Sequence, residues 1–177
     1  MPSILFVCSA NRFRSPLAAG IFKQALHEAE SEPNTSRTIG NAGSWKVGSA
    51  GTWTTPGQPV LLETYEAAKS LGLDLSNHRS VQVSEGLLSE YDLILVMQNN
   101  QKEALQSEFP QLSEQIYLLS HVVERGSYDI PDAHDSQQEV MEISAELNEL
   151  IRNGMRYICV LATYLHNIRY GPNFKNG

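Results

Sequence analysis

A cysteine and an arginine near the start of the chain, Cys8 and Arg14, are separated by five residues. The apolar run Ile4–Val7 precedes the cysteine, and apolar residues recur at helical spacing after the arginine. We therefore expect Cys8 to lie at the end of a strand, in a loop that opens a helix. In this setting a thiol becomes a thiolate and backbone N–H groups bind a phosphate. The spacing predicts an attack of sulfur on phosphorus.

The loop between Cys8 and Arg14 offers what a phosphate dianion needs from its receptor. Its consecutive backbone N–H groups can curl around one phosphoryl group as an anion-binding nest. The helix that follows adds the favourable field of its amino terminus. The guanidinium of Arg14 is a planar fork that binds two phosphate oxygens at once. The same positive field favours the thiolate form of Cys8, which is the nucleophilic form.

Two polar residues are placed to support this loop. We expect Ser15, directly after Arg14, to donate a hydrogen bond to the Cys8 sulfur and so to orient it. Asn11 tolerates left-handed backbone angles better than most residues. We expect it to hold the loop open through hydrogen bonds to neighbours such as Ser49 or His78.

A phosphate ester also needs a proton donor for its leaving oxygen. The best candidate is Asp132, which follows Pro131 ahead of the last predicted helix. Asp129 and Asp135 are its competitors. Each of the three also suits a turn or a helix cap, and Asp135 is well placed to be the N-cap of that helix.

An alternation of strands and helices positions these groups. Strands are expected at about 3–8, 46–50, 93–97 and 115–119, and helices at about 14–29, 60–71, 84–88, 99–108 and 137–167. The polar segment at about 30–44 is expected to be a surface excursion, and 120–136 a loop. The pattern predicts one α/β domain over residues 1–177, with a doubly wound sheet. Ligands of such sheets bind at the carboxyl ends of the strands, where Cys8 lies.

Composition narrows the class of protein. The net charge is −7, which argues against a nucleic acid or an anionic membrane as partner. No apolar run approaches the length of a membrane span, and the amino terminus lacks the pattern of a signal peptide. Cys8 and Cys159 are the only cysteines, too few for a disulfide scaffold, and Cys159 lies in an apolar run typical of a core. We expect a cytoplasmic protein, monomeric and without a cofactor.

Five segments resemble the low-molecular-weight protein tyrosine phosphatases, in the family's order along nearly the whole chain. They are Cys8–Pro16, Ser49–Thr52, Leu71–Ser80, Asp92–Met97 and Ile130–Asp132. The resemblance implies a flavodoxin-like sheet of four parallel strands in the order 2-1-3-4, with helices on both faces and no metal. It implies hydrolysis of phosphotyrosine in proteins, and of small aryl phosphates, through a phosphocysteine intermediate.

The resemblance also assigns roles to residues. It implies Cys8 as nucleophile, Arg14 as phosphate clamp, and Asp132 as general acid and then general base. Other matching positions brace the loop: Asn11, Ser15, Ser49 and His78. The residues expected to contact the substrate are Ser9, Ala10, Asn11, Arg12, Phe13, Arg14, Trp53 and His134.

The chain departs from the family at several positions. Ala10 stands where glycine is frequent, so its backbone must suit a residue with a Cβ. Phe13 replaces a frequent second cysteine, so the nucleophile has no disulfide guard. His134 is expected to replace one aromatic wall of the substrate slot, and Trp53 to supply another unless it packs into the core.

Three other functions deserve comparison. In arginine phosphatases of this fold a small β-branched hydroxyl residue takes the place of Arg12, whose bulky cation should repel a guanidinium. Thiol-dependent arsenate reductases need further cysteines to pass on a disulfide, and only Cys159 is present. A module that only binds phosphate does not need a nucleophile and an acid. We therefore expect a phosphotyrosine phosphatase.

Overall fold

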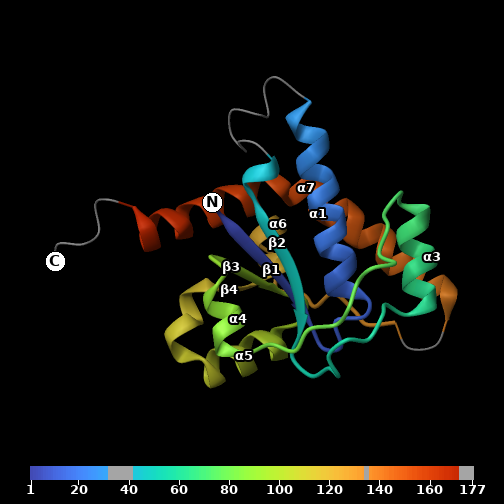
Figure 1. Cartoon of the computed structure of the whole chain (residues 1–177), viewed down its shortest axis with the longest axis horizontal. Helices are drawn as coiled ribbons and strands as arrows, with labels where there is room; N and C mark the ends of the chain where they lie inside the picture. The colour runs from blue at the N-terminus through green and yellow to red at the C-terminus, as the bar shows by residue number, and fades with distance from the viewer. Residues whose placement is uncertain (32–41, 134–135, 172–177) are drawn as a thin grey trace.

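The structure, a computed structural model, describes residues 1–31, 42–133 and 136–171. Its centre is one parallel sheet (Figure 1). The strands lie in the order β2-β1-β3-β4, which confirms the predicted topology. They are β1 (Ser3–Cys8), β2 (Lys46–Gly51), β3 (Leu93–Val96) and β4 (Ile116–Leu118). The strand order reverses beside β1, and Cys8 is the last residue of that strand.

Helices cover both faces of the sheet (Figure 1). The helices are α1 (Arg14–Glu30), α3 (Leu62–Ser70), α4 (Glu85–Ser89), α5 (Asn99–Glu108), α6 (Leu119–Glu124) and α7 (Gln137–Tyr170). Side chains of β1 alternate between two cores: Ile4 and Phe6 pack toward α1 and α7, whereas Leu5 and Val7 pack toward α4 and α5. Short 3₁₀ turns lie at Ala42–Ser44 and Pro110–Gln115.

Two details correct the sequence-based expectations. A loop was predicted over 120–136, but α6 occupies its first part; a helix of six residues is too short for hydrophobic periodicity to reveal it. The N-cap of α7 is Ser136, whose side chain accepts a hydrogen bond from Glu139 N at 3.1 Å. Asp135 itself, and residues 32–41 of the predicted excursion, lie outside the described residues.

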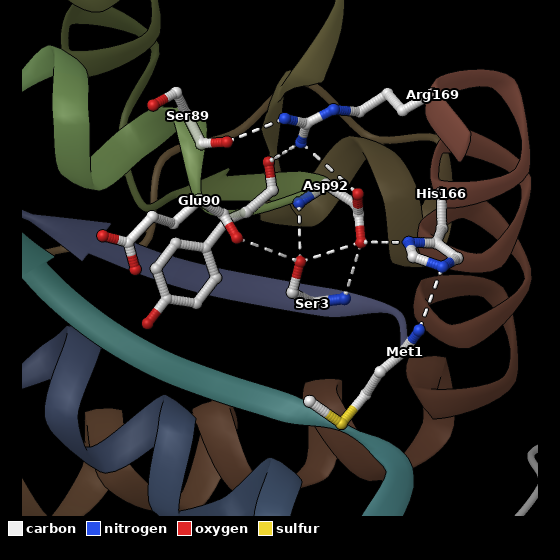
Figure 2. A network of polar contacts seen from close by, with 8 residues as sticks. Met1, Ser3, Ser89, Glu90, Asp92, His166 and Arg169 are labelled. Carbon is white, nitrogen blue, oxygen red and sulfur yellow. Dashed lines mark hydrogen bonds and ion pairs between the residues drawn. The ribbon is translucent and has the colours of Figure 1, made fainter.

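The carboxyl-terminal part of α7 is fastened to the amino ends of β1 and β3 (Figure 2). The side chain of Asp92 is 2% exposed, and its Oδ2 accepts hydrogen bonds from Ser3 N at 2.9 Å and Ser3 Oγ at 2.8 Å. His166 Nδ1 lies 3.0 Å from the same oxygen, and Arg169 Nη1 donates to Oδ1 at 3.3 Å. We call Ser3, Asp92, His166 and Arg169 the aspartate clasp. In the described part of the chain no helix is both long and apolar enough to span a bilayer.

Candidate active site

The Cys8 sulfur lies buried at the carboxyl end of β1, 3.0 Å from Ser15 Oγ. A thiolate can only accept a hydrogen bond, so in that form Ser15 is the donor. Ser15 Oγ also lies 3.2 Å from the carbonyl oxygen of Ala50 and accepts a hydrogen bond from Asn11 Nδ2 at 2.9 Å. The hydroxyl is therefore held in place and its single proton can be shared with the sulfur.

Asn11 is the centre of the contacts that hold the loop. Its backbone is left-handed, with φ of 53°, as the residue type allows. Its Nδ2 donates to Ser15 Oγ and to Ser49 Oγ, both at 2.9 Å, and its Oδ1 accepts from Val81 N at 2.8 Å. His78 Nε2 lies 2.8 Å from the Asn11 carbonyl oxygen. The structure thus brings together all four residues that the sequence assigned to bracing the loop.

His78 acts as a neutral donor in this arrangement. Burial lowers its pKa, partly opposed by the hydrogen bond to Asn11, and the nearby charges of Arg79 and Lys23 lower it further. A carbonyl oxygen can only accept, so Nε2 carries the proton. A neutral imidazole with a fixed tautomer therefore supports the backbone of the nucleophile loop.

Arg14 is a buried cation at the start of α1, 1% exposed. Its Nη2 pairs with Asp132 Oδ2 at 2.6 Å and its Nη1 donates to the carbonyl oxygen of Ile130 at 3.0 Å. Its Nε is buried and has no hydrogen-bond partner among the described residues. The Asp132 side chain is 41% exposed. Arg14 therefore connects the nucleophile loop directly to the predicted acid.

We call the loop between α6 and α7 the acid loop, and its two described aspartates have different surroundings. Asp129 Oδ1 accepts a hydrogen bond from Asn99 N at 2.7 Å, at the amino end of α5. The next residue, Ile130, donates its N–H to the carbonyl oxygen of Met97 at 2.8 Å. These two bonds anchor the acid loop at the end of β3. Asp129 thus holds the loop, while Asp132 faces Arg14.

A cavity of about 310 Å³ adjoins Asp132. Phe13, one of the residues expected to contact the substrate, lines this cavity. Trp53 does not line it, and at 88% exposed it is not a core residue either. His134 lies outside the described residues. The lining residues are Phe13, Leu61, Glu63, Asp132, Ala133, Ser136, Gln137 and Val140.

The remaining predicted residues of the loop hold its outer rim. Arg12 Nε donates to the carbonyl oxygen of Pro59 at 2.8 Å, and the Arg12 carbonyl accepts from Leu61 N at 3.1 Å. Ala10 has no positive φ, so its Cβ is tolerated. Ser9 Oγ accepts a hydrogen bond from Gln101 Nε2 at 3.0 Å. These contacts hold Arg12 against the segment after β2 and Ser9 against α5.

Two residues in this arrangement lay beyond the sequence-based assignments. Gln101 is buried, and its Oε1 accepts from Met97 N and Gln98 N, both at 3.1 Å. A glutamine at the third position of α5 is a capping signal that could have identified it. A Cβ at Gly51 would lie 2.6 Å from the Ser9 carbonyl oxygen, so only glycine fits beneath the loop.

Similarity to known proteins agrees with this geometry. The low molecular weight phosphotyrosine protein phosphatase family matches residues 3–159. The chain is 33% identical over 153 residues to a probable low molecular weight protein-tyrosine-phosphatase, EpsP, of Ralstonia nicotianae, covering 86% of this chain and 90% of that protein. It is 27% identical over 150 residues to a protein-arginine-phosphatase of Bacillus subtilis, covering 84% and 91%.

A solved structure gives the same result for the fold. The low molecular weight protein tyrosine phosphatase from T. tengcongensis superposes with a TM-score of 0.72 and 30% identity. The match covers 86% of this chain and 97% of that one. Within the described ranges no group of three or more His, Cys, Asp or Glu side chains is arranged to hold a metal ion.

Proposed function

The chain belongs to the low molecular weight phosphotyrosine protein phosphatase family, and from this premise we propose that it hydrolyses phosphotyrosine in proteins through a phosphocysteine at Cys8. The observation that carries the proposal is the Arg14–Asp132 contact of 2.6 Å. It joins a residue of the nucleophile loop to the predicted acid, 118 positions later in the sequence. Nucleophile, cation and acid therefore share one end of the sheet.

In the first step the Cys8 thiolate attacks phosphorus. The S–P bond forms as the ester P–O bond breaks, and the leaving oxygen takes a proton from the Asp132 carboxyl. Arg14 exchanges Asp132 for the phosphate oxygens, because a guanidinium binds two oxygens of a dianion in its plane. The buried Nε of Arg14 supplies one donor for this bond.

In the second step water hydrolyses the phosphocysteine. Asp132, now a carboxylate, takes a proton from the attacking water, the new P–O bond forms and the S–P bond breaks. The sulfur leaves as a thiolate, which the Ser15 hydroxyl at 3.0 Å stabilises by donating a hydrogen bond. The backbone N–H groups of the loop and Arg14 neutralise the transferred phosphoryl group in both steps.

An arginine phosphatase is the second candidate, because one of the relatives is a protein-arginine-phosphatase. The position of Arg12 opposes that substrate. Bonds from its backbone and its Nε to the 59–61 segment hold its guanidinium at the rim of the loop. A second guanidinium arriving with the phosphate would meet this fixed cation. We therefore propose phosphotyrosine ahead of phosphoarginine.

A disulfide relay, as in arsenate reduction, fits the chain poorly. Cys159 is the only thiol besides Cys8. It is buried in α7, and burial raises its pKa to about 12, so it is a poor nucleophile. Because no second cysteine guards the Cys8 thiol, the protein needs a reducing environment, and we propose that it acts in the cytoplasm. We also propose that it is a monomer.

Substitution of the nucleophile tests the proposed function. We expect Cys8→Ser to reduce turnover of phosphotyrosine peptides and aryl phosphates to background in chelator-treated buffer, because an unactivated hydroxyl is far less nucleophilic than a thiolate. Binding of inorganic phosphate, measured by calorimetry, should remain, because the loop donors are unchanged. Undiminished turnover by Cys8→Ser would contradict the nucleophile assignment. If the unmodified chain hydrolyses phosphoarginine faster than phosphotyrosine, phosphoarginine is the substrate and the proposal of phosphotyrosine is wrong.

A further inference from the structure

A groove of about 710 Å³ lies between the β4–α6 segment and the outer face of α7, away from the nucleophile loop. Three of its side chains, Tyr157, Val160 and Tyr164, are spaced at three and four residues and therefore share one face of the helix. Each is more than half exposed. The lining residues are Tyr117, His121, Val122, Arg125, Arg156, Tyr157, Val160, Leu161 and Tyr164.

The groove combines aromatic rings with positive charge. Arg125 and Arg156 are exposed, and neither has an ion pair or a side-chain hydrogen bond to another described residue. Burial raises the pKa of Tyr117, and the nearby charge of Glu114 raises it further, so its ring stays neutral. No carboxylate lines the groove. Its surface offers three aromatic rings for stacking and two free guanidinium forks for an anion.

This surface differs in charge from the rest of the chain. The whole chain has a net charge of −7, yet the lining of the groove includes two arginines and no Asp or Glu. A neighbouring cavity behind the acid loop is lined by four carboxylates, those of Glu124, Asp129, Glu146 and Glu149. The groove is thus a local site for an anion on an acidic protein. Pairing of two copies through this face would oppose like charges.

An aryl phosphate matches the groove in each of these respects. Its ring stacks on tyrosines, and its dianion pairs with two guanidinium groups in bidentate geometry. A protein substrate that carries several phosphotyrosines would present a second one at high effective concentration while the first lies in the catalytic loop. We propose that the groove binds a second phosphotyrosine of the same substrate, an inference that rests on the proposed function.

The length of α7 sets the spacing between the two phosphotyrosines. Val140 lines the cavity beside Asp132, and Tyr157 lines the groove. At 1.5 Å per residue they are about 26 Å apart along the helix axis. A fully extended peptide spans at most about 3.5 Å per residue. At least about eight residues must therefore separate the two phosphotyrosines.

Kinetics with doubly modified peptides tests this site. Each peptide carries one phosphotyrosine and one phosphonomethyl-phenylalanine, an analogue that cannot be hydrolysed, separated by about 4, 10 or 16 residues. Relative to peptides with phenylalanine at the second position, we expect KM to fall roughly tenfold for the two longer spacers. We expect no fall for the shortest spacer, and an unchanged kcat throughout. Peptides with glutamate at the second position should show little of the effect.

Variants of groove residues test whether the fall in KM for the phosphonate peptides arises in the groove. In Arg156→Gln and Tyr164→Ser the KM ratio between phenylalanine and phosphonate peptides should approach one. The matched control Lys69→Gln removes an exposed charge on α3 and should keep the wild-type ratio. An equal ratio at all spacings, or full activity of the glutamate peptides, would overturn the inference. If even the singly phosphorylated peptides are not hydrolysed, the proposed function has failed rather than this inference.

Discussion

The two ends of the sheet each contain a buried charged side chain, and they treat it differently. At the amino ends, the aspartate clasp gives Asp92 a donor or a cation on both oxygens (Figure 2). At the carboxyl ends, Arg14 is as deeply buried as Asp92. Its carboxylate partner Asp132 is 41% exposed and its Nε lacks a partner among the described residues. The charge of Asp92 is compensated at both of its oxygens, whereas Arg14 has one N–H group without a hydrogen-bond acceptor among the described residues.

The difference separates stability from chemistry. A buried charge is costly unless hydrogen bonds and counter-charges compensate it. The clasp compensates Asp92 within the fold, so we expect it to fasten α7 and to do nothing else. Arg14 keeps one donor, Nε, without a partner among the described residues. We expect that end to contribute less to stability than its burial suggests and far more to turnover.

Arg14→Lys should lower turnover of every aryl phosphate, whatever its leaving group. An ammonium group keeps the charge but cannot hold two phosphate oxygens in one plane. We expect kcat/KM for an aryl phosphate to fall roughly 10²–10³-fold, the usual loss for a donor to a developing charge. The melting temperature should change little, because Asp132 can turn to solvent. If Arg14→Lys loses much stability but keeps its turnover, Arg14 serves the fold and not the chemistry, which would contradict the comparison between the two ends.

Asp132→Ala should slow the enzyme selectively. General acid catalysis is worth roughly 10²–10⁴-fold, and an ester with a poor leaving group depends on it most. We expect phenyl phosphate to lose far more rate than an activated nitrophenyl ester. Asp129→Ala is the matched control, because its carboxylate caps α5 instead of facing Arg14. If Asp129→Ala shows the leaving-group dependence and Asp132→Ala does not, the acid is misassigned.

Asp92→Ala should act on stability alone. It leaves the buried Ser3 N–H without its acceptor and removes the partner of His166 and Arg169, which are themselves partly exposed. We expect a loss of about 3 kcal/mol, or roughly 6–12 °C in melting temperature. Turnover per folded molecule should be unchanged. Glu90→Ala, which breaks the exposed pair with Lys46, is the control and should cost under about 1 kcal/mol. If Asp92→Ala and Glu90→Ala lose the same stability, the aspartate clasp does not stabilise the fold more than an exposed ion pair does.

The smallest effect concerns pH and His78. Its pKa in the folded chain is lowered from the unfolded value of 6.5, chiefly by burial. At a pH between the folded and the unfolded pKa of His78, only the unfolded chain binds the proton. The contribution of His78 to the free energy of unfolding therefore falls as pH drops below about 6.5. His78→Gln keeps a donor for Asn11 but does not titrate. We expect it to lose less melting temperature than the wild type between about pH 7.5 and about pH 5.5. Equal losses would show that His78 is not a source of the pH dependence.

Local sequence patterns and the family resemblance predicted two parts of the molecule, the strands with the loop after β1 and the contacts of Asn11. Strands such as β3 are continuous apolar runs, and the loop from Cys8 to Arg14 lies between two such periodic segments, so its place at the end of β1 followed from local pattern. The bonds of Asn11 to Ser49 and His78 were expected from residue type and the family resemblance, and both are present.

The features that we did not predict depend on contacts between residues that are far apart in the sequence. Leu61, Glu63 and Gln137 line the cavity beside Asp132 because α3 and α7 meet the acid loop there. Nothing in their local sequence marks them. Trp53 was expected either in the slot or in the core; its indole is 88% exposed, so the core alternative is wrong, and its backbone N–H donates to the carbonyl oxygen of Ser9 at 3.0 Å. The aspartate clasp joins residues 3, 92 and 166, a separation that no local pattern reports.

The most direct test of the account is to identify the covalent intermediate. We propose that Asp132 activates the water of the second step, so Asp132→Ala with an activated aryl phosphate should accumulate phosphoenzyme. We expect acid-quenched samples, digested and analysed by mass spectrometry, to carry one phosphoryl group on Cys8 in amounts that rise with substrate and vanish in Cys8→Ser. Turnover with no phosphoryl group on Cys8, or with one on another residue, would contradict the account.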